Sequence, residues 1–209
     1  HCEKITKTDD LIKQGYLSNF RIKILLCKHE YQKFPDYHSE IEYLVTNHKR
    51  NNFIKDLVLN LEGNTLVLFN YVEKHGEPLY DLINSSVDDK RKVFFVHGSV
   101  DVDERELVRE LTEKEDNAII IASYGTFSTG INIKRLHNIV FASPSKSRIR
   151  NLQSIGRGLR KTEGKESMRL FDIADDLQYE NYTLNHLKER INIYNEENFP
   201  YNIRQFDLK

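Results

Sequence analysis

The sequence lacks the features that mark membrane proteins, disulfide-rich proteins and zinc proteins. Its 209 residues include two cysteines, one methionine, four prolines and no tryptophan. Cys2 and Cys27 are too few and too isolated for a disulfide framework or a zinc cluster, so we expect a reducing, cytoplasmic setting. No apolar run approaches the roughly 20 residues that span a bilayer, and no signal-peptide pattern opens the chain. We therefore expect no membrane partner.

A chemical motif is missing as well. The loop G-x-x-x-x-G-K-[ST], whose backbone N–H groups hold nucleotide phosphates, occurs nowhere in the chain. No Asp-Glu pair follows an apolar strand as a magnesium site would need, so we expect no metal site formed by this chain alone. The only methionine is Met168, which leads us to expect a piece of a longer protein.

Charge is distributed unevenly along the chain. The net charge is −1 at pH 7, yet the stretch from Lys134 to Arg169 holds ten Lys or Arg and only two Glu, a local charge of +8. Such asymmetry predicts a local anion-binding face rather than a generally basic protein. A solvated face on an ordinary domain is the alternative reading of the charges alone.

Apolar runs of strand length alternate with amphipathic stretches of helix length. Strands are expected at 20–27, 65–69, 93–96, 118–122, 139–142 and 169–173. Helices are expected at 38–61, 72–83, 101–111, 147–155 and 184–194, followed by a tail that can add an edge strand. This order predicts a parallel sheet with helices on both faces, in which ligands lie beyond the carboxyl ends of the strands. Function is therefore expected on the loops after Phe69, Val96, Ala122 and Ala142.

The most specific motif is Gln153-x-x-Gly156-Arg157-x-x-Arg160. Arginines at this spacing can lie on neighbouring turns of one helix face, and a planar guanidinium with five donors suits phosphate better than lysine does. In isolation, two surface arginines in an exposed helix are the alternative. Lys134-Arg135 and the run from Lys146 to Arg150 supply further cations, which we expect near the same edge of the sheet.

Four segments carry a resemblance to a known family. They are Leu66-Val67-Leu68-Phe69-Asn70, His97-Gly98 with Arg105, Thr129-Gly130-Ile131-Asn132, and the segment from Gln153 to Arg160. In this order and spacing they resemble motifs IV, IVa, V and VI of superfamily 2 helicases, over about residues 64–173; restriction-enzyme-type translocases are also similar. The resemblance implies an α/β, RecA-like three-layer domain with a mostly parallel sheet. It further implies a linker and first strand at 1–35, the helicase C-terminal RecA-like domain at 36–175, and a C-terminal helix and tail at 176–209.

The resemblance also implies a nucleotide site shared between two domains. ATP with Mg2+ would bind between this domain and the N-terminal RecA-like domain of the same protein, which would carry the phosphate loop and the acidic residues. Arg160 is expected to act as an arginine finger and Arg157 as its partner, although the two roles could be reversed. Further nucleotide contacts are expected from Gln153, Gly130, Asn132 and Gly156. We expect this chain alone to have essentially no ATPase activity.

DNA, single-stranded or branched, is the partner that the resemblance implies. Backbone N–H groups and small polar side chains at the strand ends can hold phosphates without reading sequence. The residues expected there are Asn70, His97, Gly98, Ser99, Ser123 and Thr126. Tyr124 departs from the family pattern, because many relatives have threonine at that position. A phosphate contact there would have to come from Ser123 or from the tyrosine hydroxyl.

The sequence therefore predicts the C-terminal half of the motor of an ATP-dependent DNA helicase, with recombination and repair as the expected processes. One alternative is a duplex translocase or restriction-type motor that remodels DNA without separating strands. Another is a non-catalytic nucleic-acid-binding module with a degenerate motor fold. The intact pair Arg157 and Arg160 argues against the second alternative, since a non-catalytic module has no use for both.

Overall fold

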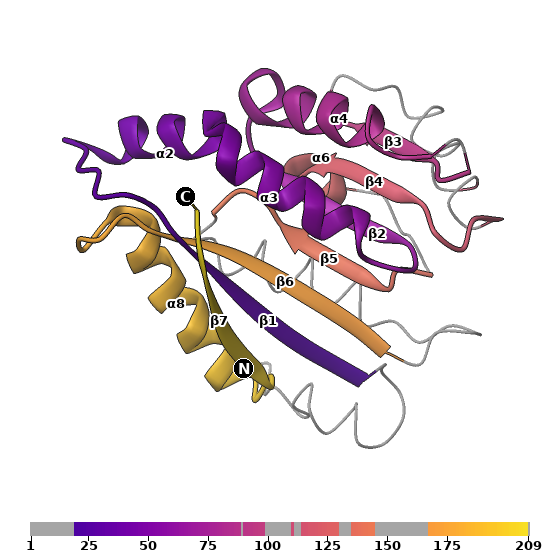
Figure 1. The fold of residues 1–209 in the computed structure, drawn as a ribbon. Coiled ribbons are helices and arrows are strands. Elements are labelled where there is room, and N and C mark those ends of the chain that lie inside the picture. The colour runs from indigo at the N-terminus through magenta and orange to yellow at the C-terminus, as the bar shows by residue number, and fades with distance from the viewer. Residues whose placement is uncertain are drawn as a thin grey trace.

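In the part of the chain that the structure describes, seven parallel strands form one sheet (Figure 1). The computed structural model describes residues 19–88, 90–98, 110, 114–129, 135–144 and 167–208. The strands follow the order β3-β4-β2-β5-β6-β1-β7, and every neighbouring pair is parallel. Their bounds are β1 Asn19–Lys28, β2 Thr65–Phe69, β3 Val93–Val96, β4 Ile119–Ser123, β5 Asn138–Phe141, β6 Ser167–Asp176 and β7 Tyr201–Asp207. The expected parallel sheet is confirmed.

The helices connect these strands. Their bounds are α2 Tyr37–Thr46, α3 His48–Leu59, the π-helix η1 Val72–Gly76, α4 Glu77–Asn84, α6 Tyr124–Thr129 and α8 Tyr182–Glu196. The single helix expected over 38–61 is wrong at Asn47, whose backbone is extended and whose Oδ1 accepts a hydrogen bond from the Arg50 backbone N–H at 3.0 Å. Asn47 thus caps the start of α3, and because its backbone is extended, α2 ends before it. The helices expected over 101–111 and 147–155 lie outside the described residues, apart from the single position 110.

The central strands are apolar on both faces because helices cover both faces. In β2, Leu66 and Leu68 pack in the cluster that includes residues of α6 and α8, whereas Val67 and Phe69 pack in the cluster that includes residues of α3 and α4. A strand buried on both faces needs a continuous apolar run rather than an alternating one. The run over 65–69 is therefore explained, and none of the described helices is long and apolar enough to cross a bilayer.

The two ends of the described chain complete the sheet. β1 pairs with β6 along ten residues, from Asn19 opposite Ser167 to Lys28 opposite Asp176. β7 pairs with β1 on its other side and forms one edge of the sheet, which confirms the edge strand expected for the tail. The division at residues 35 and 175 stays a prediction, although strands from all three parts join one sheet.

Candidate nucleotide and nucleic-acid interface

The loops expected to carry function meet at one edge of the sheet. Since all strands are parallel, the carboxyl ends of β2, β3, β4 and β5 lie on the same side (Figure 1). Of the predicted site residues, the structure describes five at this edge, namely Asn70, His97, Gly98, Ser123 and Thr126. The remaining ones lie outside the described residues: Ser99, Gly130, Asn132, Gln153, Gly156, Arg157 and Arg160.

Asn70 directly follows β2 and is bound to the segment that follows β5. Its backbone N–H donates to Ser143 Oγ at 3.1 Å, and its side-chain amide donates to the Pro144 carbonyl at 3.4 Å. The residue is half-buried. Two donors of the expected nucleic-acid residue are thus used within the domain, and its contact with nucleic acid stays a prediction.

Ser123 and Thr126 form a local cap at the start of α6. The Thr126 backbone N–H donates to Ser123 Oγ at 3.2 Å, and the two hydroxyls are 2.8 Å apart. A serine that precedes a helix and accepts from its third residue satisfies an N–H that the helix itself leaves unpaired. Both side chains are buried, so the structure gives them a capping role, and a phosphate contact by either stays a prediction.

The Tyr124 side chain is buried in the core, and its hydroxyl is bonded within the domain. It is 2% exposed, its ring centroid is 5.7 Å from that of Phe141, and its hydroxyl donates to the Ser143 carbonyl at 3.4 Å. A hydroxyl buried in this way does not face an incoming phosphate. The departure from threonine therefore serves packing in this structure, and Phe127 beside it is also a core residue at 1% exposed.

His97 and Gly98 follow the end of β3. The His97 ring is half-buried, with its centroid 5.0 Å from that of Phe95. Gly98 is exposed, and a Cβ added there would meet no atom within 4 Å. The backbone around Gly98 is thus open to a ligand, whereas the histidine ring is partly used in packing.

Arg135 does not lie at this edge, so the expectation for Lys134-Arg135 is wrong where the structure describes it. Arg135 precedes β5 and pairs with Asp116, which precedes β4, at 2.6 Å. Residues that precede parallel strands lie at the amino edge, opposite the functional loops. Clustering of charge along the sequence did not distinguish the two edges. Lys134 and residues 146–150 lie outside the described residues.

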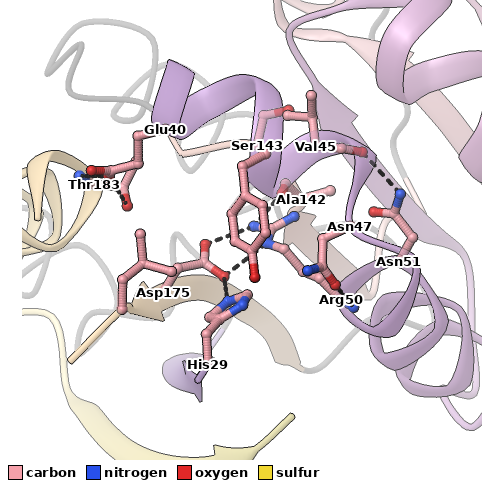
Figure 2. A network of polar contacts seen from close by, with 12 residues as sticks. His29, Glu40, Val45, Asn47, Arg50, Asn51, Ala142, Ser143, Asp175 and Thr183 are labelled. Atoms are coloured by element: carbon pink, nitrogen blue, oxygen red, sulfur yellow. Dashed lines mark hydrogen bonds and ion pairs between the residues drawn. The ribbon is translucent and has the colours of Figure 1, made fainter. Parts of the chain in front are cut away.

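A buried ion pair near the carboxyl edge of the sheet was not expected from the sequence. Arg50 Nε lies 2.8 Å from Asp175 Oδ1, and Arg50 Nη2 lies 3.0 Å from Asp175 Oδ2 (Figure 2). His29 Nε2 approaches the same carboxylate at 2.9 Å. Burial raises the pKa of Asp175, but the Arg50 charge and the His29 and Arg50 hydrogen bonds outweigh it and hold this pKa at about 2. The sequence did carry one sign of this ion pair, because Arg50 lies on the apolar face of α3 with Ile54 and Val58.

His75 is a second buried polar residue near the same loops, on the π-helix η1. It is fully buried, and its Nδ1 lies 2.8 Å from Ser143 Oγ. Burial and the nearby Arg50 charge lower the pKa of His75 to about 3, so the imidazole is neutral at physiological pH.

Among the described residues, no group of three or more His, Cys, Asp or Glu side chains is arranged to hold a metal ion.

Comparison with known families identifies the domain. The family described as the helicase conserved C-terminal domain matches residues 49–162, which is more than half of the chain. The chain belongs to this family. The match includes both the strand-end loops described above and the Gln153–Arg160 motif.

Two curated proteins show how this helicase domain relates to longer chains. It is 33% identical to the ATP-dependent DNA helicase UvsW of Enterobacteria phage T4 over 98% of this chain and 44% of UvsW. It is 29% identical to L396 of Acanthamoeba polyphaga mimivirus, provisionally named an ATP-dependent RNA helicase, over 79% of this chain and 31% of that protein. The chain thus spans less than half the length of each of these relatives.

Solved structures agree with this assignment. The crystal structure of T4 UvsW matches 92% of this chain and 42% of that chain with a TM-score of 0.77 and 32% identity. The C-terminal domain of the DEAD-box protein Dbp5 matches with a TM-score of 0.60 at 14% identity, over 89% of this chain and 90% of that domain, which shows the fold alone. The expected RecA-like α/β fold is confirmed, and the chain is a superfamily 2 helicase C-terminal domain similar to that of UvsW.

Proposed function

We propose that this domain is the C-terminal half of the motor core of an ATP-dependent DNA helicase or translocase. The observation that carries the proposal is its 33% identity to UvsW, a protein named as an ATP-dependent DNA helicase, over 98% of this chain. The aligned stretch spans both the strand-end loops and the arginine motif. The sheet supports the proposal because it brings the loops after β2, β3 and β4 to one edge.

The nucleotide would be shared with the N-terminal RecA-like domain of the full-length protein. ATP with Mg2+ supplies the phosphoryl group that is transferred to water, and the N-terminal domain supplies the phosphate loop and the metal ligands. Gly130, Asn132, Gln153 and Gly156 contact the nucleotide from this side. Arg157 and Arg160 suit that site chemically, because one guanidinium group can donate two parallel hydrogen bonds to phosphate oxygens. The described chain reaches the carboxyl edge at Pro144, beside Asn70, and the arginine motif follows nine residues later.

Arg160 acts as the arginine finger in this proposal, with Arg157 as its partner. A permanently charged guanidinium placed at the terminal phosphate stabilises the charge that develops during transfer, and such fingers contribute about 10³–10⁵ in rate. Nucleic acid crosses the same edge, where His97, Gly98, Ser99, Ser123 and Thr126 contribute phosphate contacts. Contacts of this kind read no sequence, as a motor that moves along any strand requires. Asn70 lies at this edge with its backbone N–H and side-chain amide bonded to Ser143 and Pro144.

Substitution of Arg160 in the full-length protein tests the proposal. We expect Arg160→Ala to reduce DNA-stimulated ATP hydrolysis by about 10³-fold or more while DNA binding is retained. Arg135→Ala is a matched control, because Arg135 pairs with Asp116 at the opposite edge. Unchanged hydrolysis by Arg160→Ala would instead favour a non-catalytic nucleic-acid-binding module.

Two further measurements define the substrate and the output. Hydrolysis stimulated by RNA but not by DNA would contradict the DNA assignment in favour of the activity that the L396 name indicates. Strand displacement beside triplex displacement separates a helicase from a translocase that remodels DNA. Robust ATP hydrolysis by the 209-residue chain alone would contradict the shared nucleotide site.

A further inference from the structure

Three consecutive backbone carbonyls, those of residues 142–144, each accept a hydrogen bond from a side chain in a different part of the fold. Arg50 Nη2 of α3 donates to the first at 2.9 Å. The Tyr124 hydroxyl, from the first residue of α6, donates to the second at 3.4 Å. The Asn70 amide, which follows β2, donates to the third at 3.4 Å. We call these three donors and the residues 142–144 the β5 clamp.

The side chain within the clamp is held as well. Ser143 Oγ accepts a hydrogen bond from the Asn70 backbone N–H at 3.1 Å and lies 2.8 Å from His75 Nδ1. His75 is neutral because burial lowers its pKa to about 3, so a neutral hydrogen bond links it to the serine. The chain after β5 is therefore fixed through its backbone and through this hydroxyl.

The donors are themselves held in place by buried contacts. Arg50 is fixed by its two contacts with Asp175, and Figure 2 shows the guanidinium lying between that carboxylate and Ala142. Tyr124 is buried against Phe141. Side chains locked by packing and by second contacts hold a neighbouring group with little freedom. The clamp is therefore a rigid arrangement at the carboxyl edge of the sheet.

The clamp lies at the point where the chain leaves β5 toward the arginine motif. Asn70 and Tyr124 belong to the loops that follow β2 and β4, whereas residues 142–144 lead into the segment with Gln153, Arg157 and Arg160. A catalytic arginine must reach its phosphate within a fraction of an ångström, and a misplacement of about 1 Å can reduce the rate by about 10²-fold. Groups that set the direction in which the chain leaves β5 thus affect the arginines that follow later in the sequence.

We propose that Asn70 and Tyr124 are positioning residues for the arginine segment, acting through the carbonyls of Ser143 and Pro144. This inference rests on the proposed function, since it assigns the clamp to the arginine finger. Asn70 then serves nucleotide hydrolysis through Pro144, and loss of its side chain lowers turnover without weakening DNA binding. Tyr124 performs the same task from the core.

The test uses Tyr124→Phe and Asn70→Ala in the full-length protein, at saturating DNA and at a temperature well below unfolding. Each variant is expected to lower kcat for ATP about 10-fold, with KM, DNA affinity and the unfolding temperature little changed. Because both act on one segment, the double variant should lose less than the product of the two single losses. Tyr182→Phe is the control, since its hydroxyl also donates to a backbone carbonyl at 3.4 Å, but to that of Pro35 and not to one of residues 142–144.

Each outcome decides the matter. Full kcat in Tyr124→Phe, with Arg160→Ala inactive, overturns the clamp and leaves the proposed function intact. Weaker DNA binding by Asn70→Ala, with unchanged kcat at saturating DNA, assigns Asn70 to nucleic acid and overturns its positioning role. Full activity of Arg160→Ala refutes the proposed function itself. A drop in kcat in Tyr182→Phe equal to that in Tyr124→Phe would show a general effect of lost hydroxyls and would also overturn the clamp.

Discussion

The Glu40 carboxylate on α2 accepts hydrogen bonds from both the backbone N–H and the hydroxyl of Thr183 on α8, at 2.7 and 2.8 Å. Its other oxygen accepts from the Tyr182 backbone N–H at 3.0 Å. The first N–H groups of a helix have no partner within it, and here a side chain from another helix supplies one. The contact joins two helices that are 143 residues apart in sequence at these positions.

Loss of this cap should destabilise the domain. Glu40→Ala leaves several buried donors without a partner, and we expect the free energy of unfolding to fall by about 3 kcal/mol. Urea unfolding measures the change. Glu42→Ala on the same helix removes an exposed carboxylate that pairs with Lys74, and it should leave the midpoint unchanged. Equal midpoints for the two variants would contradict the capping role.

The buried pair of Arg50 and Asp175 predicts a second large effect. Asp175→Asn leaves the guanidinium buried without its counter-charge, and we expect a loss of about 3–5 kcal/mol. The pKa of Asp175 is lowered to about 2 in the folded state, so its contribution is present at neutral pH and disappears as the pH falls from about 4 through 2. Chemical unfolding at several pH values measures both. In contrast, Glu180→Gln in the exposed pair with Lys188 should have almost no effect at any pH.

His75 predicts a dependence of stability on pH in a milder range. Its pKa is lowered from 6.5 to about 3 in the folded state, so below pH 6.5 the unfolded chain binds a proton that the folded chain does not. Stability should therefore fall with decreasing pH, by about 1.4 kcal/mol per unit between about pH 6 and 4 from this group. His75→Asn keeps an amide near Ser143 Oγ and does not titrate, so its unfolding profile should be flatter. An unfolding profile of His75→Asn as steep as that of the parent would contradict this assignment.

Gly76 is required where η1 packs on β2. A Cβ at this position would lie 2.5 Å from two atoms of the Phe69 ring, a distance that forces the ring or the helix to move. We expect Gly76→Ala to cost about 1–3 kcal/mol by overpacking. Gly98→Ala, where an added Cβ meets open space, is the control and should leave thermal unfolding unchanged. A stable Gly76→Ala would mean that the ring can move away at little cost.

The strands could be predicted because their signal is local. Residues 65–69 and 119–123 are buried on both faces, and a sheet covered by helices requires that kind of uninterrupted apolar run. The helix over 38–61 was predicted as one element because its apolar spacing continues across Asn47. What divides it is the cap that Asn47 makes with Arg50, which periodicity does not show.

Site residues were harder to predict because their roles depend on distant partners. The sequence picked Asn70 and Ser123 as polar groups at strand ends, and the structure confirms that location while binding both to neighbouring groups of the domain. It placed Arg135 at the functional edge, although the pairing with Asp116 lies at the opposite one. Residue type and order predict which strand end a group follows. They do not show what the group contacts.

The sequence by itself determined the class of the protein, because apolar periodicity and four ordered motifs are properties of neighbouring residues and identify a superfamily 2 helicase domain. Only the tertiary structure decided how the carboxyl edge is built. Arg50 meets Asp175 across 125 residues of chain, and Tyr124, Asn70 and Arg50 converge on residues 142–144 from two helices and the loop after β2. Such contacts depend on strand order and register in the folded sheet, where buried polar groups must find partners far away in sequence.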